Sequence, residues 1–311
     1  MSKVEVPNKA LKQLYIKNDL YAAVHVGLHL SLFLFFFAGS CYLIDKGDFL
    51  AAFICLIATG FLGNFLGWSG IGHELLHETV FSSRKLNRFL VRAFAIYLWN
   101  NWAYHQISHR IHHRSTMLTG VDFEFDPNQK HLERWDVFIS VTFNYKFLGR
   151  ALRNTLENAF GTVNGGFASL YILNNDENYR KVVSAARLIL LAHFSIFLIA
   201  WAVDFVAISM VFSLSPFMCN LFSRILALSQ HFGMEVDVND PRRTSRSITI
   251  PRWLEFFYAN MNYHVEHHIY AGIPFYNLPR ARKLLEDQLP EALNLKDAIQ
   301  LALNPPQKST T

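Results

Sequence analysis

The chain is poor in charged residues and in cysteine for its length. Only 17% of its 311 residues are charged and 51% are hydrophobic, whereas a soluble domain averages about 25% charged residues. This composition argues against an ordinary soluble protein and excludes an intrinsically disordered one. The three cysteines, Cys41, Cys55 and Cys219, lie far apart in apolar segments. That pattern excludes a disulfide framework, a CxxC redox pair and a cysteine-ligated iron–sulfur cluster.

Other motifs are missing as well. The chain has no glycine-rich dinucleotide fingerprint, no internal repeat and no low-complexity tract. A redox function would therefore need an electron source outside this sequence. The formal net charge of +5 would attract acidic proteins or anionic lipid headgroups, and we expect no nucleic-acid partner.

Long uncharged segments are present instead. Residues 20–44 and 49–72 carry no charge, and about 20 apolar residues are enough to cross a bilayer. The polar turn at residues 45–48 joins them into a hairpin. Residues 183–203 and 205–223 form a second apolar block, with Asp204 at the presumed turn. The sequence therefore predicts an all-α membrane protein with four transmembrane helices in two hairpins.

The distribution of basic residues predicts the orientation. With four spans, the N-terminus and residues 73–182 and 224–311 lie on one side of the membrane. Every lysine and arginine except Lys46 lies on that side or at its boundary. The positive-inside rule makes that side cytosolic. We expect one domain over residues 1–311, a retained N-terminal anchor rather than a cleaved signal peptide, and a cytosolic helical cap that includes both termini.

Eight of the 14 histidines form three tight clusters in that predicted cap. On a helix, residues three or four positions apart share one face, so each cluster offers a ready set of imidazole ligands. Imidazole suits iron, zinc, copper and nickel, and eight imidazoles are more than one metal ion can hold. The sequence therefore predicts two metal ions on the cytosolic face. The clusters are His73 with His77, then His109, His112 and His113, then His264, His267 and His268.

The pattern HxxxH, HxxHH and HxxHH resembles the integral-membrane fatty acid desaturase and hydroxylase superfamily. The segment NMNYHVEHH at residues 260–268 is similar to the third box of that family, and Ile273-Pro274 and Leu278-Pro279 are similar to the residues that come after that box. The segment ALSQHFG at residues 227–233 matches the place of an additional ligand after the last span. The resemblance covers roughly residues 20–285. It implies nine iron ligands, namely His73, His77, His109, His112, His113, His231, His264, His267 and His268.

A ligating imidazole usually donates its second N–H to a carboxylate or a carbonyl, so supporting residues are expected behind the ligands. His105 is four positions before His109 and departs from the plain box, which leaves it as a supporting residue or a further ligand. Asn260 could support the third box or a metal-bound water. His25, His29 and His193 are expected to pack as neutral residues inside the spans. The candidates for support are His105, Asp122, Asp126, Asn260 and Glu266, with Glu74 and Glu78 as further carboxylates.

The resemblance implies O2-dependent oxidation of an unactivated C–H bond in a lipid acyl chain by two iron ions cycling between Fe2+ and Fe3+. Fatty acyl desaturation is the first expectation, and a lipid hydroxylase or a carotenoid-type ketolase on the same scaffold is the alternative. Because the sequence contains no electron source, we expect a separate donor, either ferredoxin or a cytochrome b5-type protein.

Two other classes of function must be weighed. Residues 73–77 read HELLH, which is the HExxH signature of a zinc metalloprotease with Glu74 as general base. That interpretation leaves the second and third clusters without a purpose. A metal carrier would place its ligands near the middle of the bilayer, whereas these clusters lie at one face.

Overall fold

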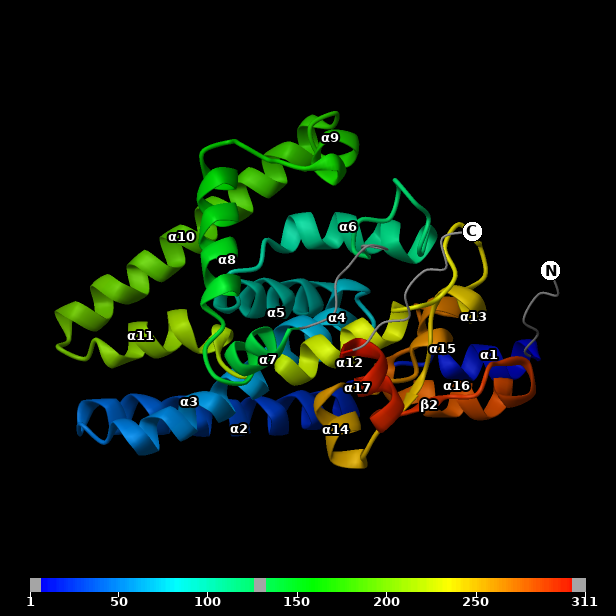
Figure 1. The fold of residues 1–311 in the computed structure, drawn as a ribbon, viewed down its shortest axis with the longest axis horizontal. Helices are drawn as coiled ribbons and strands as arrows, with labels where there is room; N and C mark the ends of the chain where they lie inside the picture. Colours follow the sequence, from blue (N-terminus) through cyan, green and yellow to red (C-terminus); the bar gives the residue numbers. More distant parts are fainter. Residues whose placement is uncertain (1–6, 126–132, 304–311) are drawn as a thin grey trace.

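The first two long helices form a hairpin in the computed structural model, which describes residues 7–125 and 133–303 (Figure 1). After the short α1 (Asn8–Leu14), α2 spans Asp19–Asp45 and α3 spans Phe49–Asn64. The side chain of Asn18 caps α2, and Asp48 caps α3 by accepting a hydrogen bond from the Ala51 amide. A π-helical turn, η1 (Phe65–Ser69), and α4 (Ile71–Leu76) then extend α3. The arrangement matches the predicted first hairpin.

The second apolar block differs from the prediction. The helix α10 spans Asp176–Ala202 and is followed by α11 (Ala207–Leu214) and the 3-10 turn η2 (Ser215–Phe217). The prediction of one helix over residues 205–223 is wrong, because the helical path is interrupted before Leu221. Met218 is extended and pairs with Phe143 in a β-bridge, and Cys219 has a positive φ of 47°.

Three helical stretches in the described residues are long and apolar enough to cross a membrane, namely Asp19–Asp45, Phe49–Leu76 and Asp176–Ala202. The stretch Ala207–Phe217 is apolar but shorter. The two hairpins meet where Gly60 packs against η2. A Cβ atom at Gly60 would lie 2.3 Å from the carbonyl oxygen of Met218, so only glycine allows this close contact between the backbones.

Shorter helices connect and follow the hairpins. In Figure 1 both hairpin tips point to the left and α1 lies toward the right, with α4, α6, α12 and α15 between them. Two short strands, β1 (Ile248–Thr249) and β2 (Leu293–Asn294), pair in parallel. The remaining elements are α5 (Arg84–Tyr97), α6 (Trp102–Arg114), α7 (Arg134–Val141), α8 (Tyr145–Ala159), α9 (Gly166–Tyr171), α12 (Leu221–His231), α13 (Pro241–Thr244), α14 (Arg252–Phe257), α15 (His264–Ile269), η3 (Phe275–Asn277), α16 (Leu278–Leu285), η4 (Glu286–Gln288) and α17 (Leu295–Leu303).

One apolar core supports the first and third histidine boxes. Phe65, Ile71 and Leu75 from η1 and α4 are fully buried, and they belong to the same cluster as Tyr258 and Phe275. Burial of large apolar side chains is the main favourable term in folding. This shared core fixes α4 relative to the segment that carries α15.

Candidate metal centre

Four short helices position the histidines that the sequence singles out. His73 lies on α4 and His77 is the residue that caps its C-terminal end. The second box lies on α6, whose N-terminus is capped by the side chain of Asn101. The third box forms α15, and His231 is the last residue of α12.

The nine predicted ligands fall into two sets in the structure. We call them the first and the second histidine group. Within each group, the candidate ligand atoms lie within 4.8 Å of one another. The first histidine group is His73, His77, His109, His113 and His267, and the second histidine group is His112, His231, His264 and His268.

The imidazoles face one another through their Nε2 atoms. In the first histidine group, Nε2 of His109 lies 3.0 Å from that of His77 and 3.1 Å from that of His113. In the second histidine group, Nε2 of His264 lies 2.9 Å from that of His231 and 3.0 Å from that of His268. Metal–imidazole bonds of about 2.1 Å at right angles would hold two nitrogen atoms about 3.0 Å apart.

The two groups are immediate neighbours. The rings of His113 and His268 stack with centroids 4.3 Å apart and an interplanar angle of 18°. Adjacent residues of one helix also serve different groups, as His112 and His113 do on α6 and His267 and His268 do on α15. The two neighbouring histidine groups therefore share α6 and α15.

Carboxylates fix the orientation of two imidazoles of the second box. Nδ1 of His109 lies 2.9 Å from Oε2 of Glu124, and Nδ1 of His112 lies 2.9 Å from Oδ2 of Asp122. An ionised carboxylate only accepts hydrogen bonds, so Nδ1 of each ring carries the proton. The lone pair is then on Nε2, which points into the histidine groups.

Two neutral acceptors have the same effect in the second histidine group. Nδ1 of His231 donates to the carbonyl oxygen of Thr244 at 2.8 Å. The hydroxyl of Thr116 donates to the carbonyl of His112 at 2.7 Å, which leaves its oxygen to accept from Nδ1 of His268 at 3.1 Å. Lone pairs aimed at one another across about 3 Å repel, and a bound cation would turn that repulsion into coordination.

The protonation state agrees with ligation. Burial, followed by the nearby imidazoles, holds the pKa of His264, His267 and His268 well below the usual histidine value. At His112 burial is the largest single effect and lowers the pKa, but the hydrogen bond to Asp122 and the charges of Glu124 and Asp122 together outweigh it, so the pKa is raised. Neutral imidazole is the form that binds metal. The residues present therefore suit a pair of metal ions.

Some predicted supporting residues lie elsewhere. The Glu266 carboxylate accepts hydrogen bonds from Ser247 and Arg282 rather than from an imidazole, because it points to the opposite side of α15. Asn260 donates to the carbonyl of Phe275 at 3.2 Å and holds the chain before the third box. Asp126 lies outside the described residues.

The two glutamates near the first box also differ from each other. Oε1 of Glu74 lies 3.3 Å from Nδ1 of His267, within ion-pair distance but without hydrogen-bond alignment, and the other oxygen accepts from Thr79. Glu78 points outward and pairs with Arg84 and Arg88.

His105 belongs to neither histidine group. Its Nδ1 lies 3.1 Å from the side-chain nitrogen of Asn100, and its ring stacks on Trp68 with an interplanar angle of 16°. It does lie near His109 and Glu124, with which it could form a third, smaller set of ligand atoms.

The three histidines that the sequence predicts inside the membrane spans do not belong to either histidine group. His193 bonds Ser213 and the carbonyl of Ile96, and it stacks on Trp99. His25 and His29 contact the rings of Phe256 and Phe257.

Sequence reasoning missed three partners of the imidazoles. Glu124 stands two positions after the candidate Asp122, within the acidic segment at residues 120–127, and that segment could have pointed to it. Nothing in the sequence marks Thr116 or the carbonyl of Thr244, because both reach their histidine through the fold.

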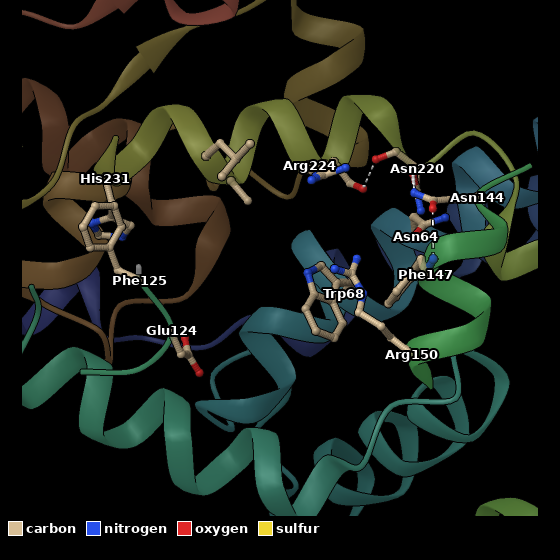
Figure 2. Close-up of a pocket in the computed structure, with 13 residues that line it drawn as sticks. Asn64, Trp68, Glu124, Phe125, Asn144, Phe147, Arg150, Asn220, Arg224 and His231 are labelled. Carbon is tan, nitrogen blue, oxygen red and sulfur yellow. Dashed lines mark hydrogen bonds between the residues drawn. The ribbon is translucent and has the colours of Figure 1, made fainter. Parts of the chain in front are cut away.

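A branched cavity leads away from the histidine groups. One part, of about 340 Å³, is lined by His73, His109, His112 and His264 among others. A neighbouring part, of about 250 Å³, begins at Glu124 and His231 and passes Trp68 (Figure 2). Trp68, Glu124 and His231 line both parts, so the centre is reached through a partly apolar passage.

Comparison with known proteins agrees with the geometry. Residues 48–297 match the family described as fatty acid desaturase. The chain is similar to the chloroplastic omega-6 fatty acid desaturase of Spinacia oleracea, with 26% identity over 250 residues, which is 73% of this chain and 52% of the relative. The chain thus spans about half the length of the curated relative it matches. Because the family match covers most of the chain and includes both histidine groups, the chain belongs to the fatty acid desaturase family of membrane oxidoreductases.

Proposed function

We propose that the protein introduces a double bond into a fatty acyl chain of a lipid by O2-dependent oxidation. The observation that carries this proposal is the placement of nine imidazoles in two adjacent groups, with hydrogen bonds that direct the Nε2 lone pairs of His109 and His112 inward. When bound, a pair of iron ions supplies the oxidising chemistry for an unactivated C–H bond, which no side chain provides.

The protein's own residues hold, orient and enclose that centre. The first and second histidine groups would hold the two ions through imidazole nitrogen atoms. Glu124, Asp122 and Thr116 keep the imidazoles in the tautomer that ligation needs. The cavity around Trp68 and Phe123 offers room for an apolar chain next to the histidine groups.

The proposal extends to the topology of the protein in the membrane. We infer four membrane crossings, the fourth being the short stretch Ala207–Phe217 with the residues around it, and a cytosolic position for both termini and the histidine groups. The positive-inside rule supports this orientation. A separate donor, ferredoxin or a cytochrome b5-type protein, would supply the electrons.

The geometry of Glu74 argues against a zinc metalloprotease. A general base must reach a water bound to the metal, but the Glu74 carboxylate is fully buried and lies beside Nδ1 of His267, the nitrogen that points away from the first histidine group. The gathering of all nine imidazoles at one place likewise argues against a carrier, which would distribute its sites along a path.

Mass spectrometry of lipids tests the proposal directly. The protein is expressed in a host with a simple lipid profile, and its acyl lipids are compared with those of a His267→Ala control. A loss of about two mass units that depends on O2 supports desaturation. A gain of about sixteen mass units would replace desaturation with hydroxylation. Binding of one zinc ion and no iron would overturn the oxidative mechanism.

A further inference from the structure

The end of the smaller cavity that lies farther from the histidine groups carries two arginines from different helices. Figure 2 shows Arg150, from α8, and Arg224, from α12, on opposite sides of this cavity, with Glu124 and His231 at the other end. Arg224 precedes His231 by seven positions on the same helix, which corresponds to about 10 Å along the helix axis. The cavity therefore joins a cationic end to the candidate metal centre.

Within the part of the chain that the structure describes, the two guanidinium groups have no acidic partner in contact. Among residues 7–125 and 133–303, neither Arg150 nor Arg224 forms an ion pair or a side-chain hydrogen bond. Asp136 attracts Arg224 over a longer distance, but its carboxylate pairs with Lys146 at 2.9 Å. Burial, followed by repulsion from Arg150, lowers the pKa of Arg224, which indicates that the two cations act on one another.

The neighbouring polar groups are already occupied. The side-chain nitrogen of Asn64 donates to the carbonyls of Gly60 and Pro216, and that of Asn144 donates to Asn220 at 3.3 Å. The charged donors that line this end of the cavity are the guanidinium N–H groups of Arg150 and Arg224. Guanidinium is the side-chain group best suited to bind phosphate or carboxylate with paired hydrogen bonds.

Exposed apolar and aromatic side chains near this cationic end suit contact with a lipid surface. Large apolar side chains are exposed on α7 and just after α8, with Phe138 at 54% and Phe160 at 84% exposure. Trp135 and Tyr145, which commonly lie at the level of lipid headgroups, are also exposed on α7 and α8. An acyl lipid could therefore enter at this end with its polar group next to Arg150.

We propose that Arg150 and Arg224 bind the anionic group at the polar end of the acyl substrate, phosphate or carboxylate, and so direct its chain along the cavity toward the histidine groups. This proposal rests on the proposed function for the identity of the substrate chain, but the cationic site itself can be tested without turnover.

Equilibrium binding tests the site first. Iron-loaded, detergent-solubilised protein is titrated with four radiolabelled probes, namely dioleoyl phosphatidylglycerol, oleoyl-coenzyme A, oleate and dioleoyl diacylglycerol. We expect the anionic probes to bind at least about tenfold more tightly than diacylglycerol, as the loss of charge-assisted hydrogen bonds would predict. The tightest of the three anionic probes identifies the source of the anionic group. Equal binding of diacylglycerol overturns the proposal.

Variants then assign the residues. Arg224→Gln and the double variant Arg150→Gln/Arg224→Gln should each lose that preference, and Arg224→Lys should restore part of it. Arg153→Gln, on the exposed surface of α8 and outside the cavity, is the matched control and should bind like the native protein. Unchanged binding by a double variant that retains its iron overturns the proposal.

Steady-state kinetics separates this proposal from the proposed function. With the preferred anionic lipid, Arg224→Gln should raise KM about tenfold and change kcat much less. If the native protein oxidises none of the lipids, the proposed function fails, whereas the binding data still decide whether the arginines hold an anion.

Discussion

The carboxylate of Glu124 accepts a hydrogen bond from Nδ1 of His109 at 2.9 Å. Its other oxygen accepts from the hydroxyl of Ser108, so both acceptor atoms of the carboxylate are engaged with α6. His109 in turn contacts both His77 and His113 within the first histidine group. Glu124 therefore orients the ring that lies between two other members of the first histidine group.

Replacing Glu124 with glutamine should weaken metal binding at the first histidine group. The amide can present its N–H₂ group to Nδ1 and so favour the tautomer with the lone pair on the wrong nitrogen. We expect a loss of metal affinity of about 10- to 100-fold, measured by competition with a chelator. Glu177→Gln, at an exposed pair with Lys181, should leave the affinity unchanged. A native affinity in Glu124→Gln would contradict the role assigned to this carboxylate.

Replacement of His231 and replacement of His105 should affect metal binding differently. His231→Ala removes a member of the second histidine group, and we expect the protein to lose the metal ion of that group while retaining the other. His105→Asn should retain both ions, because His105 contacts Asn100 and Trp68 instead. Metal analysis of the purified variants measures both outcomes. Loss of metal from His105→Asn would show that this residue is a ligand.

Removing the metal should destabilise the protein. Without a cation, Nε2 of His264 faces two other nitrogens at 2.9 and 3.0 Å in a buried site. A ligand that binds only the native state stabilises it by about 2.7 kcal/mol at a free concentration one hundred times Kd. We expect chelation to lower Tm by several degrees and Fe2+ to restore it, as followed by thermal unfolding in detergent. An unchanged Tm would mean that the histidine groups hold no metal.

Two glycine substitutions should have opposite effects on stability. Gly60→Ala places a Cβ against the backbone of Met218, so the hairpins must separate, at a cost of about 1–3 kcal/mol or more. Gly149→Ala lies within α8 with no atom within 4 Å and should stabilise that helix by about 0.5–1 kcal/mol. Thermal unfolding of the two variants compares them, and equal Tm values would contradict the packing described for α3 and η2.

Local sequence is enough to specify the ligand types and the first hairpin. The spacing of His109, His112 and His113 places them about one helical turn apart. Because residues at that spacing share a helix face, the sequence alone predicts a cluster of imidazoles there. The uncharged residues 20–44 and 49–72 likewise define their helices without reference to the rest of the chain, because length and hydropathy are local properties.

Features that depend on contacts between distant segments were settled by the packing of the helices. The division of the boxes between two groups, with His112 and His113 on the same helix serving different groups, results from how α4, α12 and α15 pack around α6. The hydrogen-bond partners of Glu266 and Glu124 also depend on the fold. Each carboxylate bonds to the residue that packs against its own side of the helix or loop. The break before Leu221 also depends on a distant contact, because the extended chain at Met218 pairs with Phe143.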